Sequence, residues 1–222
     1  MHKHDAWRIF RWEDAMDQIG KTLDLIKIKL NQYFNNIHRE NEEWTIVSNI
    51  VKQDGSLYEN AKDKVVIFLT NIQHETIVST YNKNMPVNDQ RFAIVAPPIY
   101  INLYVLFYAN YYDGNYRDGL MMLSGTISFF QQNPTFTQAN LPGLESNIDK
   151  LTFEMVNMDL TERSYLYGLI GSKCLPSVLY KVRMIPFISN ELQGQAPAVQ
   201  GLQDQAEPLD DVDKQELDNQ NG

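Results

Sequence analysis

Hydrophobic positions alternate with polar or aromatic ones over residues 99–109, which is the most regular pattern in the chain. Side chains of a β-strand point alternately to its two faces, so the pattern predicts a strand with one fully apolar face. The other face carries three tyrosines, and we expect something to cover it, because a solvated sheet face rarely holds so many aromatic side chains. Beyond a turn at 113–115, apolar residues at helical spacing predict a helix that packs back on this strand and ends at Asn133. The tyrosines are Tyr100, Tyr104 and Tyr108.

Two further patterns precede this strand. Apolar residues three and four positions apart predict a long helix over 14–38, and its length of about 37 Å is enough to cross a sheet. Period-two alternation predicts a strand at 44–51, and the Asp54-Gly55 pair predicts a hairpin turn that leads to a second strand at 64–72. The second strand is apolar on both faces and is therefore expected inside the sheet.

The C-terminal part of the pattern continues this alternation of strands and helices. A strand is predicted from Leu151, followed by a short helix that Asp159 or Thr161 caps and Gly171 ends. A last strand is predicted at 178–185, with Leu179, Lys181, Arg183 and Ile185 on one of its faces. The order of elements predicts an α/β (α+β) fold, in which a mixed sheet of about five strands is packed by a long N-terminal helix and two shorter helices.

Composition divides the chain into three parts, which are an aromatic N-terminal arm at 1–13, a domain at 14–188 and an acidic tail at 189–222. The tail holds eight acidic residues and one lysine, so almost all of the net charge of −9 lies there. No apolar period survives in it, which is typical of a disordered or extended segment. The arm has three large aromatic residues within six positions, and we expect them to dock on the same subunit or on a neighbour.

Charge and hydropathy argue against two classes of partner. The first 189 residues are nearly neutral, whereas a nucleic-acid-binding protein needs clustered Lys and Arg. The longest apolar run is shorter than the roughly 20 residues that a membrane span needs. Residues 1–5 lack the apolar stretch of a signal peptide. We therefore expect no nucleic acid and no membrane as partners, and synthesis in the cytoplasm.

A search for catalytic or metal-binding residues finds no site. The single cysteine, Cys174, excludes an intrachain disulfide and a cysteine-based zinc site, and its apolar context predicts a buried thiol. His2 and His4 lack a third ligand, and the turn at 113–119 has Arg117 where a calcium ligand is needed. No nucleophile elbow or glycine-rich phosphate loop is present. We expect no catalytic residue, no cofactor and no metal, and a protein that is not an enzyme.

Three segments, 98–110, 127–136 and 175–184, are similar to those of a known family. On these segments the chain resembles the terminator, or cap, proteins of extracellular contractile injection systems, which are phage-tail-like particles. The patterns at 65–72 and 150–160 agree with the same family. The motifs are hydrophobic and structural, so their specificity lies in their combination.

The resemblance covers roughly residues 14–188 and implies a fold similar to that of phage tail terminators, assembled as a hexameric ring. Such a ring ends the inner tube and the contractile sheath at the tip distal to the baseplate. The partners implied are further copies of the chain, the sheath and inner-tube subunits, and a second cap protein if this chain is an adaptor. The particle is assembled in the bacterial cytoplasm and can be released from the cell. The resemblance implies no catalytic residues in this chain.

The sequence thus favours a structural cap or cap adaptor over two alternatives. One alternative is a baseplate or tube-initiator subunit of the same particle, and the other is a small ligand-binding α/β domain with a site under the connection 73–96. For the cap, we expect the last strand (178–185) or the first (44–51) to offer an edge to an extended sheath arm. Charges on the last strand are otherwise typical of a solvated or edge-protecting face. The candidate interface residues are Trp7, Phe10, Trp12, Tyr100, Tyr104, Tyr108, Tyr111, Tyr112, Leu179, Lys181 and Arg183.

Overall fold

The chain forms two compact units, of which the larger contains residues 1–81 and 97–189 and the smaller contains 82–96 and 190–222. A computed structural model provides the structure. It describes residues 17–56, 58–76, 85–88, 91–95, 98–112, 114–187 and 192–197.

The larger unit is built on a mixed six-stranded sheet in the order β1-β2-β5-β8-β7-β6. All neighbouring strands are antiparallel except β1, which is parallel to β2. The predicted α/β class is confirmed, and the strand beyond the expected five or so is β6, which is too short to leave a pattern in the sequence. The strands are β1 Thr45–Val47, β2 Lys64–His74, β5 Ile99–Asn110, β6 Thr135–Phe136, β7 Leu151–Val156 and β8 Ser177–Phe187.

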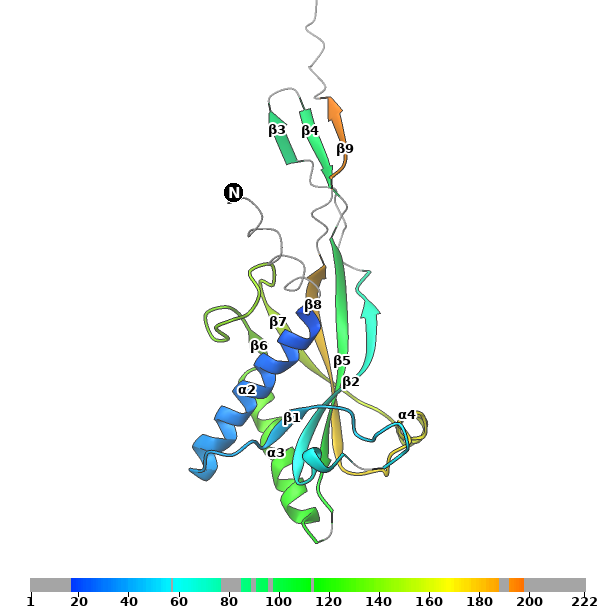
Figure 1. Cartoon of the computed structure of the whole chain (residues 1–222). Helices are drawn as coiled ribbons and strands as arrows, with labels where there is room; N and C mark the ends of the chain where they lie inside the picture. Colours follow the sequence, from blue (N-terminus) through cyan, green and yellow to red (C-terminus); the bar gives the residue numbers. More distant parts are fainter. Residues whose placement is uncertain are drawn as a thin grey trace, which may run out of the picture. The chain divides into compact units, whose positions relative to one another are not determined.

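Helices cover both faces of this sheet, with α2 and α3 on one face and α4 on the other (Figure 1). The caps of α4 are those that the sequence predicts. The Asp159 carboxylate accepts a hydrogen bond from the Glu162 backbone N–H at 2.7 Å, and the Glu162 side chain accepts one from the Asp159 backbone at 3.1 Å. Gly171 ends the helix with φ 72°. The helical elements are α2 Gln18–His38, the 3₁₀ turn η1 Glu59–Ala61, α3 Tyr116–Gln132 and α4 Leu160–Ile170.

The main core lies between the sheet and the helices α2 and α3, on what we call the inner face. Leu30 and Phe34 of α2 are buried there against Phe107 of β5 and its neighbours. The two helices approach closely, since a Cβ added at Gly125 of α3 would lie 2.6 Å from the Phe34 ring. The ring centroids of Phe107 and Phe130 are 5.0 Å apart. Aromatic packing of this kind fixes how the helices sit on the strands.

A β-bulge in β8 changes which residues face the core. The register between β5 and β8 shifts between Ile101 and Leu103, so that β8 holds one extra residue before Ile185. Ile185 is fully buried in the main core. Simple alternation predicted that Ile185 shares a face with Lys181 and Arg183, and this was wrong because a bulge reverses the alternation beyond it.

The connection between β1 and β2 also differs from the expected hairpin. The turn at Asp54-Gly55 is present, with Gly55 at φ 78° and its N–H donating to the Lys52 carbonyl at 2.9 Å. However, the strands on either side of it run parallel. Parallel neighbours need a crossover connection, so the turn lies within that crossover and does not join two paired strands.

The smaller unit contains a three-stranded antiparallel sheet in the order β3-β4-β9. Strand β9 lies in the C-terminal segment, where the sequence predicted no regular structure. Its residues are rich in Gln, Gly and Pro, and they pair through the backbone, which leaves no apolar period. The division of the chain at residues 13 and 188 stays a prediction. The strands are β3 Met85–Asn88, β4 Arg91–Val95 and β9 Leu192–Pro197.

Candidate assembly surface

The outer face of the large sheet, opposite α2 and α3, is divided into a covered half and an open half. The covered half lies under α4 and the connection between β1 and β2, where it forms a second apolar core. The open half carries polar side chains from β2, β5, β8 and β7. The buried residues of the covered half are Ile50, Ala61, Val66, Leu106, Tyr108, Tyr167 and Leu179.

Tyr108 and Leu179 belong to the covered half. Tyr108 is 1% exposed, and its hydroxyl donates to the Lys173 carbonyl at 3.0 Å. Its ring lies 6.0 Å from that of Tyr167, and burial raises the pKa of Tyr108 to about 12. Leu179 is 7% exposed. The chain itself therefore covers these two candidates, and they are not part of the surface of the folded unit.

Tyr111 and Tyr112 follow β5 and have different environments. Tyr111 is buried against α3, where a Cβ added at Gly119 would lie 2.9 Å from the Tyr111 Cβ. Burial raises the pKa of Tyr111 well above its usual value. Tyr112 is half-buried, and the ammonium of Lys62 lies 5.2 Å from its ring centroid. Tyr111 thus positions the start of α3, and Tyr112 keeps part of its ring accessible.

Tyr100 and Tyr104 lie on the open half and are both half-buried. The Tyr104 hydroxyl donates to the Gln73 side-chain oxygen at 2.8 Å. The ammonium of Lys181 lies 6.0 Å from the Tyr104 ring centroid. These contacts run across β2, β5 and β8, so they hold the tyrosine in one orientation on the surface.

Arg183 is the centre of a charged network on the same half. Its guanidinium contacts Glu75 at 3.0 Å and Glu154 at 3.1 Å, and the Asn102 amide also donates to Glu75 at 3.0 Å. Glu75 is only 5% exposed. The hydrogen bond to Glu154 is the main cause that raises the pKa of Arg183. Arg183 therefore ties β2, β8 and β7 together and has its charge balanced within the unit.

The edges of the sheet correct one prediction. Strand β8 lies between β5 and β7, so the prediction that it presents a free edge was wrong. The alternative in that prediction was the first strand, and β1 is indeed an edge strand. At the opposite margin, the described pairing between β7 and β6 is limited to Leu151 and Thr152, and it leaves 154–156 at the border of the sheet.

Two helices present apolar side chains to solvent, which the sequence analysis did not single out. Leu160, Tyr165 and Leu169 of α4 are 83%, 71% and 88% exposed. Leu120 and Met121 of α3 are exposed as well. The sequence did contain a signal for this exposure, since α4 has apolar residues on all of its sides. Only one face of α4 packs on the second core, so the apolar residues on its other sides have to be exposed. Contiguous patches of exposed apolar groups are typical of surfaces that bind other proteins.

Three candidates lie outside the described residues. They are Trp7, Phe10 and Trp12 of the aromatic arm.

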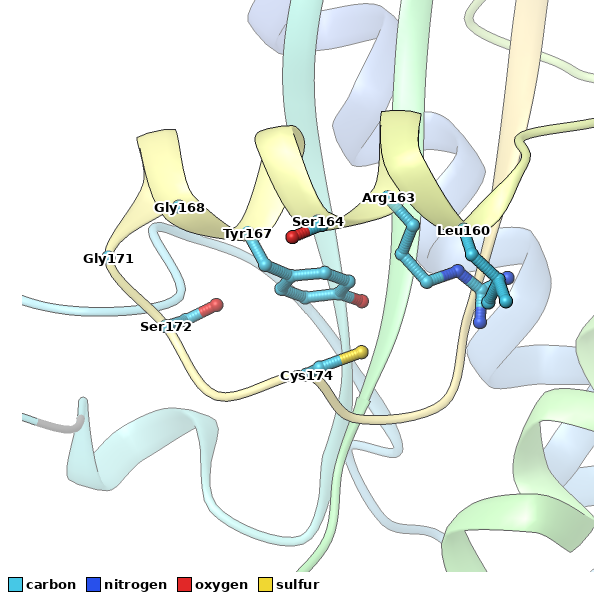
Figure 2. A pocket seen from close by; sticks show the side chains of 8 residues that line it. All are labelled: Leu160, Arg163, Ser164, Tyr167, Gly168, Gly171, Ser172 and Cys174. Atoms are coloured by element: carbon cyan, nitrogen blue, oxygen red, sulfur yellow. The ribbon is translucent and has the colours of Figure 1, made fainter.

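The hollow beside α4 offers little chemistry (Figure 2). Cys174 at its rim is exposed, so the predicted burial of this thiol was wrong, since the connection that carries it runs over the surface. The Tyr167 hydroxyl is already bonded to the Leu175 carbonyl at 3.0 Å and to Ser177 Oγ at 2.6 Å. In the described part of the chain, no three His, Cys, Asp or Glu side chains are grouped to hold a metal ion. Of the helices described, none has the length and apolar character to cross a membrane.

Comparison with known proteins gives a family and two structures. Residues 23–201 match the model of the Pvc16 N-terminal domain. The PVC sheath/tube terminator of an extracellular contractile injection system, in its extended state, is 17% identical with a TM-score of 0.52, over 78% of this chain and 60% of that one. The anti-feeding prophage tube-terminating cap is 12% identical with a TM-score of 0.44, over 78% and 59%. No curated protein sequence matches the chain.

The family match spans all three segments on which the resemblance to terminator proteins rested, so that resemblance is confirmed. At 17% identity the terminator structure shows that the fold is shared. This chain covers about 60% of the length of that terminator.

Proposed function

Because the chain belongs to the family of the Pvc16 N-terminal domain, we propose that it is a structural cap, or cap adaptor, of a phage-tail-like injection particle. It binds where the inner tube and contractile sheath end, and it stops their polymerisation. The observation that carries this proposal is the fold, which is shared over 78% of this chain with a sheath/tube terminator. The proposed activity is therefore assembly, without a reaction.

A cap needs one surface that the last layer of the polymer can bind. The edge strand β1 and the margin 154–156 of β7 are two places in the described part of the larger unit where an extended arm of a sheath subunit can add as a further strand. Both are short, which limits how many backbone hydrogen bonds a stray chain can make there. We propose that one of them receives the sheath arm.

A cap also has to close on itself, and we propose a ring, with six copies as the expected number. In a closed ring each copy contacts its neighbour through two different surfaces. The exposed apolar side chains of α4, Leu160 and Leu169 among them, supply one such surface, since burying a Leu side chain contributes about 1.5–3 kcal/mol before the costs of association. The open half of the outer face, with Tyr100 and Tyr104, supplies the second.

The arrangement of polar groups supports a structural role more than a ligand-binding one. The side chains on the open half, including Arg183 and Tyr104, form bonds with one another across strands and do not converge on a hollow. We infer that the protein assembles with the particle in the bacterial cytoplasm and leaves the cell as part of it.

Removal of the chain from particle assembly tests this proposal. Particles produced without it are expected to have inner tubes and sheaths of irregular length, and adding the purified protein during assembly restores a uniform length. A variant with Leu160 and Leu169 changed to Glu is the matched control, because it alters only exposed positions and should fold but not restore length. Uniform lengths without the protein would contradict a terminator, and missing baseplates would instead favour an initiator subunit.

A further inference from the structure

One end of the inner face of the large sheet is apolar, and the described part of the chain leaves it exposed. Ile72 of β2 is 48% exposed and Ile99 of β5 is 53% exposed. Ile101 lies between them in the ladder and is 9% exposed. These three residues, which we call the apolar end, continue the surface on which α2 packs further along the sheet. The exposed fractions mean that helix α2 stops short of covering them.

The chain enters the described structure at the border of the apolar end. Helix α2 begins at Gln18, whose buried side-chain amide donates to the Pro186 carbonyl at 3.1 Å. Pro186 of β8 is the ladder partner of Tyr100, which is the residue next to Ile99. The start of α2 is thus fixed one strand away from β5 and two strands away from β2.

The preceding residues are long enough to cover this surface. Trp12 stands five residues before Asp17, and an extended chain of that length reaches about 17 Å at roughly 3.3 Å per residue. Neighbouring strands are about 4.8 Å apart, so β5 and β2 lie within about 10 Å of β8. Trp12 and Phe10 can therefore reach Ile99 and Ile72 without any change in the described structure.

We propose that the aromatic arm docks on its own subunit, with Phe10 and Trp12 packed over Ile72 and Ile99. An aromatic side chain buries about 150–250 Å² when it is fully packed, which suits an apolar strip two strands wide. A short tether gives the arm an effective concentration in the millimolar range at its own subunit. The arm of another copy would have to compete with this, and the same subunit is therefore the favoured acceptor.

Quenching of a fluorophore by tryptophan tests this docking in the full-length chain. His74 is exposed and pairs with Ile101, so a bimane label on His74→Cys, in a Cys174→Ser background, lies beside the apolar end without replacing its apolar residues. Trp44 stays in every variant as a constant background. Docking predicts that the label is several-fold brighter when Trp7 and Trp12 are both changed to Phe.

Two controls make the result specific. Changing Ile72 and Ile99 to Ser is expected to brighten the label as much as removing the tryptophans does, since the arm loses its acceptor. A label on Leu169→Cys, on the opposite face of the sheet, should not respond to either change. The proposal is overturned if the label at residue 74 is equally bright with and without Trp7 and Trp12. It is also overturned if quenching grows with protein concentration, because the arm would then come from another copy.

Discussion

The two halves of the outer face lie on the same strands and share the same alternating sequence pattern, but their side chains have different environments. Tyr108 and Tyr104 are four residues apart on β5 and point to the same face. Tyr108 is buried under α4, whereas Tyr104 lies in the open and bonds to polar neighbours. Tyrosine suits both positions because it joins an apolar ring to a polar hydroxyl. The packing of α4, and not the strand pattern, therefore decides which half belongs to the core and which half stays exposed.

The largest expected effect comes from the covered half. Leu106→Ala removes a fully buried side chain from the second core, and it is expected to lower the free energy of unfolding by about 2–5 kcal/mol. Urea denaturation followed by circular dichroism measures it. An effect below about 1 kcal/mol would mean that α4 does not hold this half closed.

Loss of Arg183 on the open half has the next largest effect. Arg183→Met keeps most of the side-chain volume but leaves the buried Glu75 carboxylate without its guanidinium partner. A hydrogen bond to a charged group contributes about 1.5–3 kcal/mol, and we expect the lower part of that range, because the Arg183 side chain is 31% exposed and Glu75 keeps its hydrogen bond from Asn102. The same denaturation series measures it. Glu154→Gln is the matched control and should have little effect, since Glu154 is exposed.

Alkaline pH tests the covered half in another way. The pKa of Tyr108 is raised to about 12 from 10.0, because burial disfavours the phenolate. A group whose pKa is higher in the folded state contributes stability that is fully present below pH 10 and is lost as pH rises towards about 12. The unfolding midpoint in urea should therefore fall over this range. In Tyr108→Phe the fall should be smaller.

Tyr104→Phe at neutral pH is expected to have the smallest effect on stability. It removes one exposed hydrogen bond to Gln73, so the free energy of unfolding should change by no more than about 0.5 kcal/mol. If the open half contacts a neighbouring subunit, the same change should still reduce ring formation. Light scattering of the protein with tube and sheath ends measures this. If Tyr104→Phe lowered both the free energy of unfolding and ring formation, Tyr104 would support the fold in the way that Tyr108 does.

Much of the fold follows from local patterns in the sequence. The strand at 99–110, the helix at 116–132 and the capped helix at 160–170 are all predicted, because their periods and caps are properties of neighbouring residues. The parallel pairing of β1 with β2 and the bulge before Ile185 are not predicted, since both depend on which strands meet in space. Strand β9 was missed because its residues, Leu192–Pro197, show no apolar period in the sequence.

The candidate surface was predicted less well than the fold. The period of two identified a tyrosine-bearing face correctly, but it could not show that α4 would cover Tyr108 and Leu179 and leave Tyr104 open. The prediction that the last strand offers a free edge was wrong, because β8 lies inside the sheet. Exposed apolar residues such as Leu169 become visible only once the packed face of α4 is known.

The central claim is that this chain ends a polymer, and imaging of labelled particles tests it most directly. Particles assembled with gold-labelled protein, attached through Cys174, which is exposed, can be viewed by electron microscopy. If the chain is a terminator, we expect the label at the tip distal to the baseplate, in a closed ring, on every intact particle. Label at the baseplate, or protein that stays monomeric and unbound beside complete particles, would contradict it.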